Sequence, residues 1–236
     1  ALPLPVSSLL ETEKPVTLLA GTNAPEKLIC AAAYLSRGLT PPALTQDETR
    51  DMLRAMLQNP RKRELEQASF TLLYGGMSLA ALTHLTRHRM QSLAAPDLLR
   101  AARYDRYVLP ESVVSAGMET RYRAAFSLAE LAAQKLKKLG AGEDVLSYLL
   151  VSGLKVPVVS TMNAGELVTF FRLRTCDRAQ WEIRELATEA LKVLREAHPV
   201  LFSLYGPTCF MTGACPEGKM CCGKTQQARE KFSGTL

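Results

Sequence analysis

The sequence predicts an α+β fold in which helices cover a mixed or antiparallel sheet, and three observations support this class. Short apolar runs rich in β-branched residues, typical of strands, occur at residues 16–20, 68–74 and 155–162. Several longer segments space their apolar residues as amphipathic helices do. Strands and helices do not alternate strictly along the chain, which favours α+β over a regularly alternating arrangement.

The length and composition predict one domain. At 236 residues and 47% hydrophobic content, the chain is long enough for a good-sized core. No Ser/Gly-rich linker or block of like charge divides it. We therefore expect a single domain over residues 1–205, followed by a cysteine-rich tail over residues 206–236.

The N-terminal part is expected to form a strand and two helices. After the strand at 16–20, Asn23 should cap a helix with Pro25 in its first turn and Glu26 at the capping-box position. Gly38 should end that helix. Residues 47–57 have the apolar spacing of a second helix.

The central and C-terminal parts add two strands and further helices. Gly75 and Gly76 should end the strand that starts at residue 68. Asn163 with Glu166 predicts a capped helix running to Arg172. In the last long helix, Trp181 should face the core and Glu182 the solvent. The remaining expected elements are helices at 78–89, 112–139 (closed by Gly140), 143–151 and 178–197, and the strand at 155–162.

Composition restricts the class of ligand. The formal net charge of +6 suits an anionic ligand such as a nucleotide or a phosphate-bearing cofactor. Nucleic acid is the alternative, but the basic residues are scattered and only 6% of the residues are aromatic, so a stacking platform for bases is missing. We expect no nucleic-acid partner.

No membrane or export signal is expected. The longest apolar stretches fall well below the roughly 20 residues of a membrane span. Residues 1–6 are apolar but lack a basic flank, unlike a signal peptide. The expected location is the cytoplasm, with reduced thiols.

The triplet Arg87-His88-Arg89, followed by Ser92, carries the main functional signal. It concentrates cationic and imidazole groups, and no carboxylate lies between Glu66 and Asp97. Such density suits a polyanion or an electron-rich ring such as a flavin. A surface basic cluster at a helix C-terminus is the alternative explanation.

A second segment, residues 172–184, makes the pattern more specific. Together with the triplet and Ser92, it resembles the flavin-dependent thymidylate synthases, the ThyX family. Further similar segments occur in the family's order and extend over roughly residues 16–205; they are Pro25-Glu26-Lys27-Leu28-Ile29, Ala68-Ser69-Phe70-Thr71, Asn163-Ala164 and Ala179-Gln180-Trp181-Glu182-Ile183-Arg184.

The resemblance implies a homotetramer that uses FAD, methylenetetrahydrofolate and NADPH to methylate a uracil nucleotide, dUMP in the family. Arg174 would stabilise the N3-deprotonated uracil, which makes carbon 5 electron-rich. The FAD site would comprise Ser69, Arg87, His88, Arg89, Asn163, Ala164, Thr169 and Arg178, and the substrate site His84, Ser92, Arg100, Arg103 and Arg174.

Several positions depart from the family pattern on the nucleotide side. Leu99 and Ser147 stand where the family has arginines that bind the nucleotide phosphate. Arg100 and Arg103 lie close enough in sequence to replace the first of them. A diverged paralogue without synthase activity, which binds flavin or another anion or serves as a structural partner, is therefore the alternative function.

The tail holds four cysteines within fourteen residues, Cys209, Cys215, Cys221 and Cys222. Glycines and prolines between them would permit the turns of a metal or iron–sulfur site, but the sequence has no Cys-x-x-Cys pair. A mobile tail with free thiols or a disulfide is the preferred interpretation. Cys30 and Cys176 are expected to pack as small apolar residues.

Overall fold

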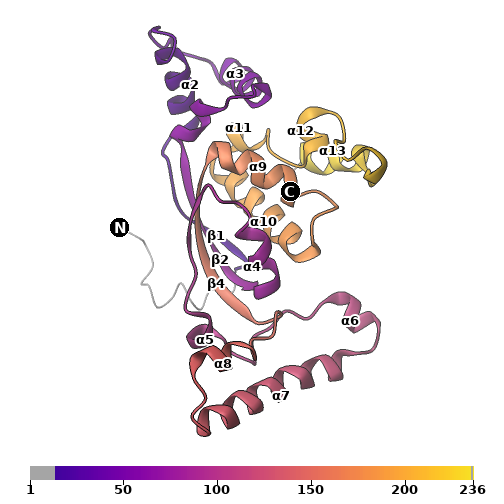
Figure 1. Ribbon diagram of the computed structural model, residues 1–236. Helices are drawn as coiled ribbons and strands as arrows, with labels where there is room; N and C mark the ends of the chain where they lie inside the picture. The colour runs from indigo at the N-terminus through magenta and orange to yellow at the C-terminus, as the bar shows by residue number, and fades with distance from the viewer. Residues whose placement is uncertain (1–13, 235) are drawn as a thin grey trace.

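A four-stranded antiparallel sheet organises the described part of the chain, which in this computed structural model comprises residues 14–234 and 236. The strand order is β1-β2-β4-β3, so the two long strands lie in the middle (Figure 1). The expectation about residues 1–6 falls outside the described residues. The strands are β1 Val16–Gly21, β2 Ser69–Ser78, β3 Gln91–Ala94 and β4 Lys155–Asn163.

One face of the sheet carries the core. Three helices, α4 (Leu79–Leu85), α9 (Ala164–Arg174) and α10 (Trp181–Ala197), pack on that face (Figure 1). Phe70 and Tyr74 of β2 point into this layer and are buried, because alternate side chains of a strand share one face. The predicted α+β class, an antiparallel sheet covered by helices, is confirmed.

Strand β2 does not end at the two glycines. It continues through Gly75 and Gly76 to Ser78, with a shift in its register against β4 between Tyr74 and Met77. The expected end of the strand is therefore wrong, since glycine within a strand also marks a bulge.

Strand β3 has no counterpart among the expected elements. Its sequence, Gln-Ser-Leu-Ala, lacks the β-branched residues that mark a strand. It forms because β4 offers an unpaired edge, along which Gln91 pairs with Met162 and Ala94 with Val159.

Helices α2 (Pro25–Leu35) and α3 (Gln46–Gln58) and the short helix η1 (Arg63–Gln67) lie beyond one end of the sheet (Figure 1). The expected cap of α2 is wrong by one residue. Ala24 holds the N-cap position in a left-handed conformation (φ 47°), and no side chain caps the helix.

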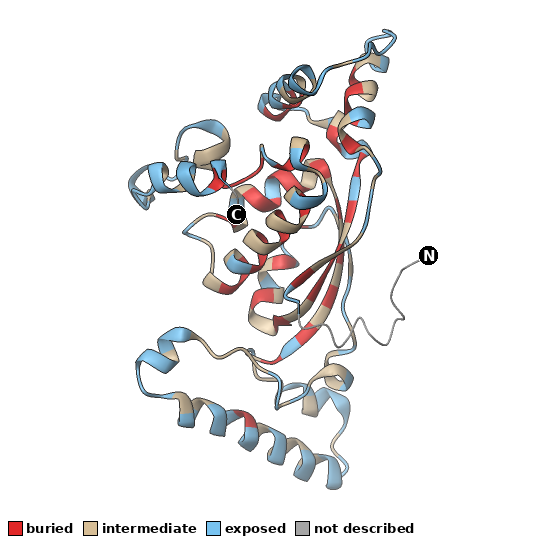
Figure 2. Ribbon diagram, turned by 180° about the vertical axis from the view of Figure 1, so that it is seen from behind, coloured by how far each residue is buried: buried red, intermediate tan, exposed pale blue. Residues whose placement is uncertain are grey.

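An arm of helices extends from the opposite end of the sheet (Figure 2). The expected long helix at 112–139 is interrupted at Gly117, whose φ of 65° favours glycine. The helix expected at 143–151 ends earlier, at Ser147. Helix α7 has Phe126 as its buried residue, and this ring stacks on Tyr107 at 4.1 Å between centroids. The arm consists of α5 Leu98–Ala101, α6 Glu111–Ser115, α7 Glu119–Lys138 and α8 Glu143–Ser147.

Helix α10 buries a carboxylate that the sequence pattern predicted to face the solvent. Glu182 is buried, with 6% of its surface exposed. Its two oxygens accept hydrogen bonds from the backbone N–H and the hydroxyl of Ser78, the N-cap residue of α4. The helical pattern put Glu182 on the polar face, but a polar group can be buried once tertiary partners satisfy it.

The cysteine-rich tail is folded onto the domain, so the expectation of a mobile tail is not met. Helices α11 (Pro199–Phe202), α12 (Thr208–Thr212) and α13 (Thr225–Ser233) follow α10. Phe232 of α13 is buried and belongs to the main core. The half-buried Arg195 donates to the carbonyls of Phe202, Tyr205 and Gly234. A few aromatic residues and one arginine thus anchor a segment whose overall composition is polar.

Within the described residues, no helix is both long and apolar enough to span a membrane.

Candidate active site

The triplet Arg87-His88-Arg89 lies in the connection after α4, not within it. The helix ends at Leu85, whose carbonyl accepts from the backbone N–H of His88 and from the side chain of Gln91. His88 is buried, whereas Arg87 and Arg89 are exposed. The connection therefore turns the imidazole inward and leaves the two guanidiniums free to meet a ligand.

The buried imidazole joins two charged residues of α9. His88 Nδ1 lies 3.2 Å from Glu166 Oε1, and Arg174 Nε donates to His88 Nε2 at 3.0 Å. The ring packs edge-on against Phe170, at 5.1 Å between centroids. Expected members of both the cofactor site and the substrate site thus meet here.

The two termini of α9 place these charged groups. At its start, Asn163 Oδ1 accepts from the backbone N–H of Glu166, which confirms the predicted cap. The Glu166 side chain does not complete a capping box but turns to His88. At its end the helix runs on to Arg174, two residues beyond the predicted Arg172.

The electrostatics of the cluster favour a neutral imidazole. Burial, and after it the positive charge of Arg174, lower the pKa of His88 to about 4. Burial also raises the pKa of Glu166. Burial and the nearby Arg87 lower the pKa of Arg174, although a guanidinium remains charged at neutral pH.

The small polar residues and backbone groups expected to line the cofactor site also lie close together. Ser69 of β2 pairs with Asn163 of β4, and the N–H of Ala164 donates to the carbonyl of Ala68. Both strands therefore bring these residues to the start of α9, whose other end carries Arg174. Thr169 lies exposed on the same helix.

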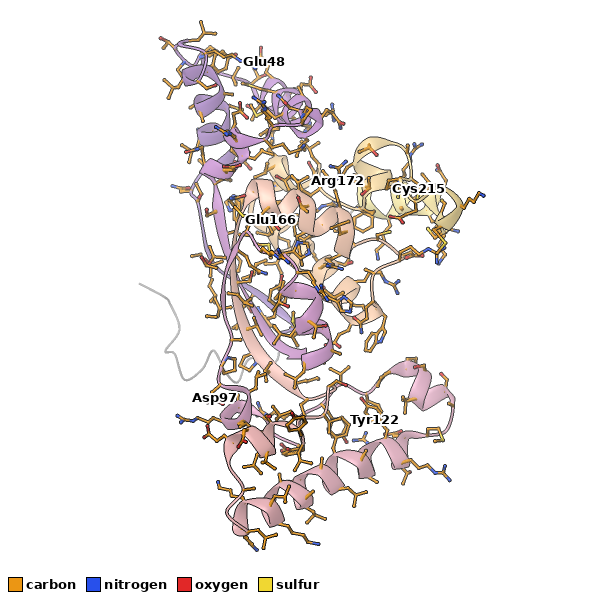
Figure 3. The ribbon with its side chains drawn as sticks, in the orientation of Figure 1. Glu48, Asp97, Tyr122, Glu166, Arg172 and Cys215 are labelled. Carbon is orange, nitrogen blue, oxygen red and sulfur yellow. The ribbon has the colours of Figure 1, made fainter. Side chains whose placement is uncertain are left out.

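Other predicted residues lie apart from this cluster. Ser92 is exposed on the edge strand β3, and His84 is half-buried on α4. Arg100 and Arg103 belong to the arm region, where each pairs with a nearby aspartate, Asp97 or Asp105. Figure 3 labels Asp97 at the end of the molecule away from Glu166.

A cavity of about 290 Å³ separates the end of α9 from the tail. Arg178, predicted for the cofactor site, lies here, and its Nε donates to the carbonyl of Met220. Lys224 forms an ion pair with Asp177 at 2.6 Å across the cavity rim. The cationic residues that line the cavity are Arg172, Arg174, Arg178, Arg184, Lys224 and Lys231.

Thiols gather around the same cavity. Cys176, Cys209, Cys215 and Cys222 line it, so Cys176 is not simply a packed core residue, whereas Cys30 is buried as predicted. All six cysteines are free thiols. Among the described residues, no group of three or more His, Cys, Asp or Glu side chains is placed to hold a metal ion.

We expect Cys221 to be the most reactive thiol of the tail. The N–H of Gly223 donates to its sulfur at 3.4 Å, and this bond, with one from Cys215, lowers its pKa. Thiol-modification kinetics on the native protein should lose their fastest phase in Cys221→Ser and retain it in Cys222→Ser. Elemental analysis that finds one stoichiometric zinc or several irons, lost on mutating the tail cysteines to serine, would contradict the free-thiol interpretation.

Sequence reasoning missed two acidic residues, Glu166 as a partner of His88 in the candidate site and Glu182 as a buried anchor of α4. Both have a sequence signal, since each is an acidic residue in the first turn of a helix. That signal indicates a favourable interaction with the helix dipole and does not identify a distant partner.

Comparisons with known proteins found a matching family model and several relatives of one name. Residues 17–200 match the model of the family described as "Thymidylate synthase complementing protein". A protein of Geobacter sulfurreducens named flavin-dependent thymidylate synthase is 34% identical over 92% of this chain and 97% of its own length. Relatives of the same name from Clostridium tetani and Sulfolobus acidocaldarius are 31% and 32% identical, over 92% and 83% of this chain and 96% and 78% of their own lengths.

Proposed function

Because this chain belongs to the family of thymidylate synthase complementing proteins, we propose that it is a flavin-dependent thymidylate synthase that converts dUMP to dTMP. The one-carbon unit comes from methylenetetrahydrofolate, and NADPH is the final reductant. The observation that carries the proposal is the bond between the buried His88 and the half-buried Arg174, at the position where the ThyX resemblance expects the arginine that binds uracil.

The residues around the triplet fit FAD. The FAD diphosphate is a dianion, and Arg87 and Arg89 offer two exposed guanidiniums that form no ion pair within the described chain. Ser69 and Asn163 lie side by side across β2 and β4, next to the start of α9. These groups would hold the cofactor, which when bound supplies the hydride that reduces the transferred carbon unit.

Arg174 would activate the pyrimidine. Its Nε is occupied by His88, so contacts to the substrate fall to its two Nη groups. Because the side chain is partly buried, its charge acts through less solvent than a surface cation would. A fixed cation of this kind favours the N3-deprotonated ring and makes carbon 5 nucleophilic without an attacking residue from the enzyme.

The exposed apolar surface supports a homotetramer. Leu128 and Leu131 of α7 are 66% and 52% exposed, and the arm that carries them stands away from the core (Figure 2). Contiguous exposed apolar residues mark protein–protein contacts. Helices α5 and α8 carry the positions expected to bind the nucleotide phosphate and lie beyond the end of the sheet, whereas α9, which carries Arg174, lies on its face (Figure 1). A second copy of the chain would bring α5 and α8 to the same site as α9.

The alternative is a flavin-binding paralogue without synthase activity. It is favoured by Leu99 and Ser147, which leave α5 and α8 without the arginines that bind the nucleotide phosphate in the ThyX family. Formation of dTMP from dUMP, methylenetetrahydrofolate and NADPH by the FAD-loaded protein tests the synthase directly. FAD binding without any dTMP at saturating dUMP would establish the alternative.

We expect Arg87→Ala and Arg89→Ala each to weaken FAD binding by about 10- to 100-fold, since a hydrogen bond to a charged group contributes about 1.5–3 kcal/mol. Titration of FAD fluorescence measures this. Arg37→Ala removes an exposed arginine just after the end of α2, which lies beyond the end of the sheet, and serves as the control. Absence of FAD binding by the unmodified protein would overturn the flavin assignment.

A further inference from the structure

We propose that Glu166 is a positioning residue that acts through His88 to aim Arg174. The proposal rests on the proposed function for the role of Arg174. The connection through His88 rests on the geometry alone.

The three partners of the imidazole lie along one stripe of α9. Glu166, Phe170 and Arg174 follow each other at intervals of four residues, which places them on neighbouring turns of one helix face. Eight residues of helix rise about 12 Å. The ring of His88 lies over Phe170 in the middle of this stripe and joins the carboxylate at one end to the guanidinium at the other.

The donor and acceptor roles within this chain of hydrogen bonds are determined. Arginine only donates, so His88 Nε2 must accept from Arg174 Nε and cannot carry a proton. The proton of the neutral ring therefore sits on Nδ1, where it is donated to Glu166 Oε1. Both side chains are largely buried, with 3% of His88 and 13% of Glu166 exposed, so water is a poor substitute for either partner.

Loss of the Glu166 carboxylate should allow the His88 ring to change to the other tautomer. A buried Nδ1–H without an acceptor is unfavourable, and the proton would move to Nε2. Nε2–H and the N–H of Arg174 would then face each other as two donors. Arg174 would lose the bond that fixes its direction, while its charge and its place on α9 would remain.

The variants Glu166→Leu and Glu166→Gln separate the acceptor from the rest of the side chain. Leucine is similar in size and cannot accept. Glutamine lacks the charge, but its carbonyl oxygen can still accept from Nδ1–H. Glu185→Leu on α10 is the control, because it removes an exposed carboxylate outside the cluster. Glu166→Met replaces the leucine variant should that protein not fold, as judged by circular dichroism.

The first measurement is the histidine tautomer by ¹⁵N NMR, made on the protein without added substrate. The chain has three histidines, so the resonances of His88 can be assigned with His84→Gln and His198→Gln variants. We expect Nδ1–H in the unmodified protein, in Glu166→Gln and in Glu185→Leu, and Nε2–H or a mixture in Glu166→Leu. Nδ1–H retained at His88 in Glu166→Leu would overturn the proposal.

The second measurement is the split between kcat and KM. Misdirecting a group that acts in the transition state should lower kcat in Glu166→Leu by about 10- to 100-fold and change KM for dUMP by only a few-fold. Glutamine should recover most of the lost kcat. An unchanged kcat in Glu166→Leu would refute the role in catalysis even if the tautomer shifts.

The two measurements also separate this proposal from the proposed function. If the unmodified protein makes no dTMP, the synthase assignment fails, and the NMR comparison still decides whether Glu166 fixes the tautomer of His88.

Discussion

Replacing Arg174 with alanine is expected to lower kcat for dTMP formation by about 10²- to 10³-fold, the usual cost of removing a preorganised group that stabilises developing negative charge. The guanidinium is held by His88 and is partly desolvated on α9, so a cation from the solvent would not replace it. Initial rates at saturating FAD, NADPH, folate and dUMP measure the effect.

Lysine at position 174 should restore only part of this loss. It provides the positive charge but lacks the planar fork that donates to His88 and to the pyrimidine at once. Arg37→Ala should leave kcat unchanged. A kcat in Arg174→Ala within a few-fold of the unmodified enzyme would show that the uracil ring is activated elsewhere.

Restoring arginine at Leu99 and Ser147 is expected to strengthen dUMP binding by about 10- to 100-fold for each residue, since each can form a charge-assisted bond of about 1.5–3 kcal/mol to phosphate. Helices α5 and α8, which carry the two positions, contact each other, so both arginines could reach one phosphate. Calorimetry of dUMP with the FAD-loaded variants tests this.

Val145→Arg adds the same charge to α8 at a neighbouring exposed position and controls for a general electrostatic effect. The unmodified protein should bind dUMP weakly. Micromolar affinity would instead show that Arg100 or Arg103 already compensates. Their ion pairs with Asp97 and Asp105 are exposed, and such pairs cost little to break.

Local sequence patterns predicted much of the framework. The runs at 16–20 and 155–162 became β1 and β4, because their β-branched residues suit a half-buried pleated surface. The cap at Asn163 was also correct, since capping involves residues only three positions apart. Strand β3 and the continuation of β2 through two glycines were not predictable in this way, because pairing with β4 decides both.

The sequence by itself determined the family and the residue types of the candidate site, through the Arg87-His88-Arg89 triplet and the segment around Arg174. Only the tertiary structure decided how these residues are arranged. It turned His88 inward while Arg87 and Arg89 stayed exposed, and it paired His88 with Glu166, 78 positions away. Such contacts depend on how strands and helices pack over long sequence separations, and local spacing carries no information about which buried polar groups will meet.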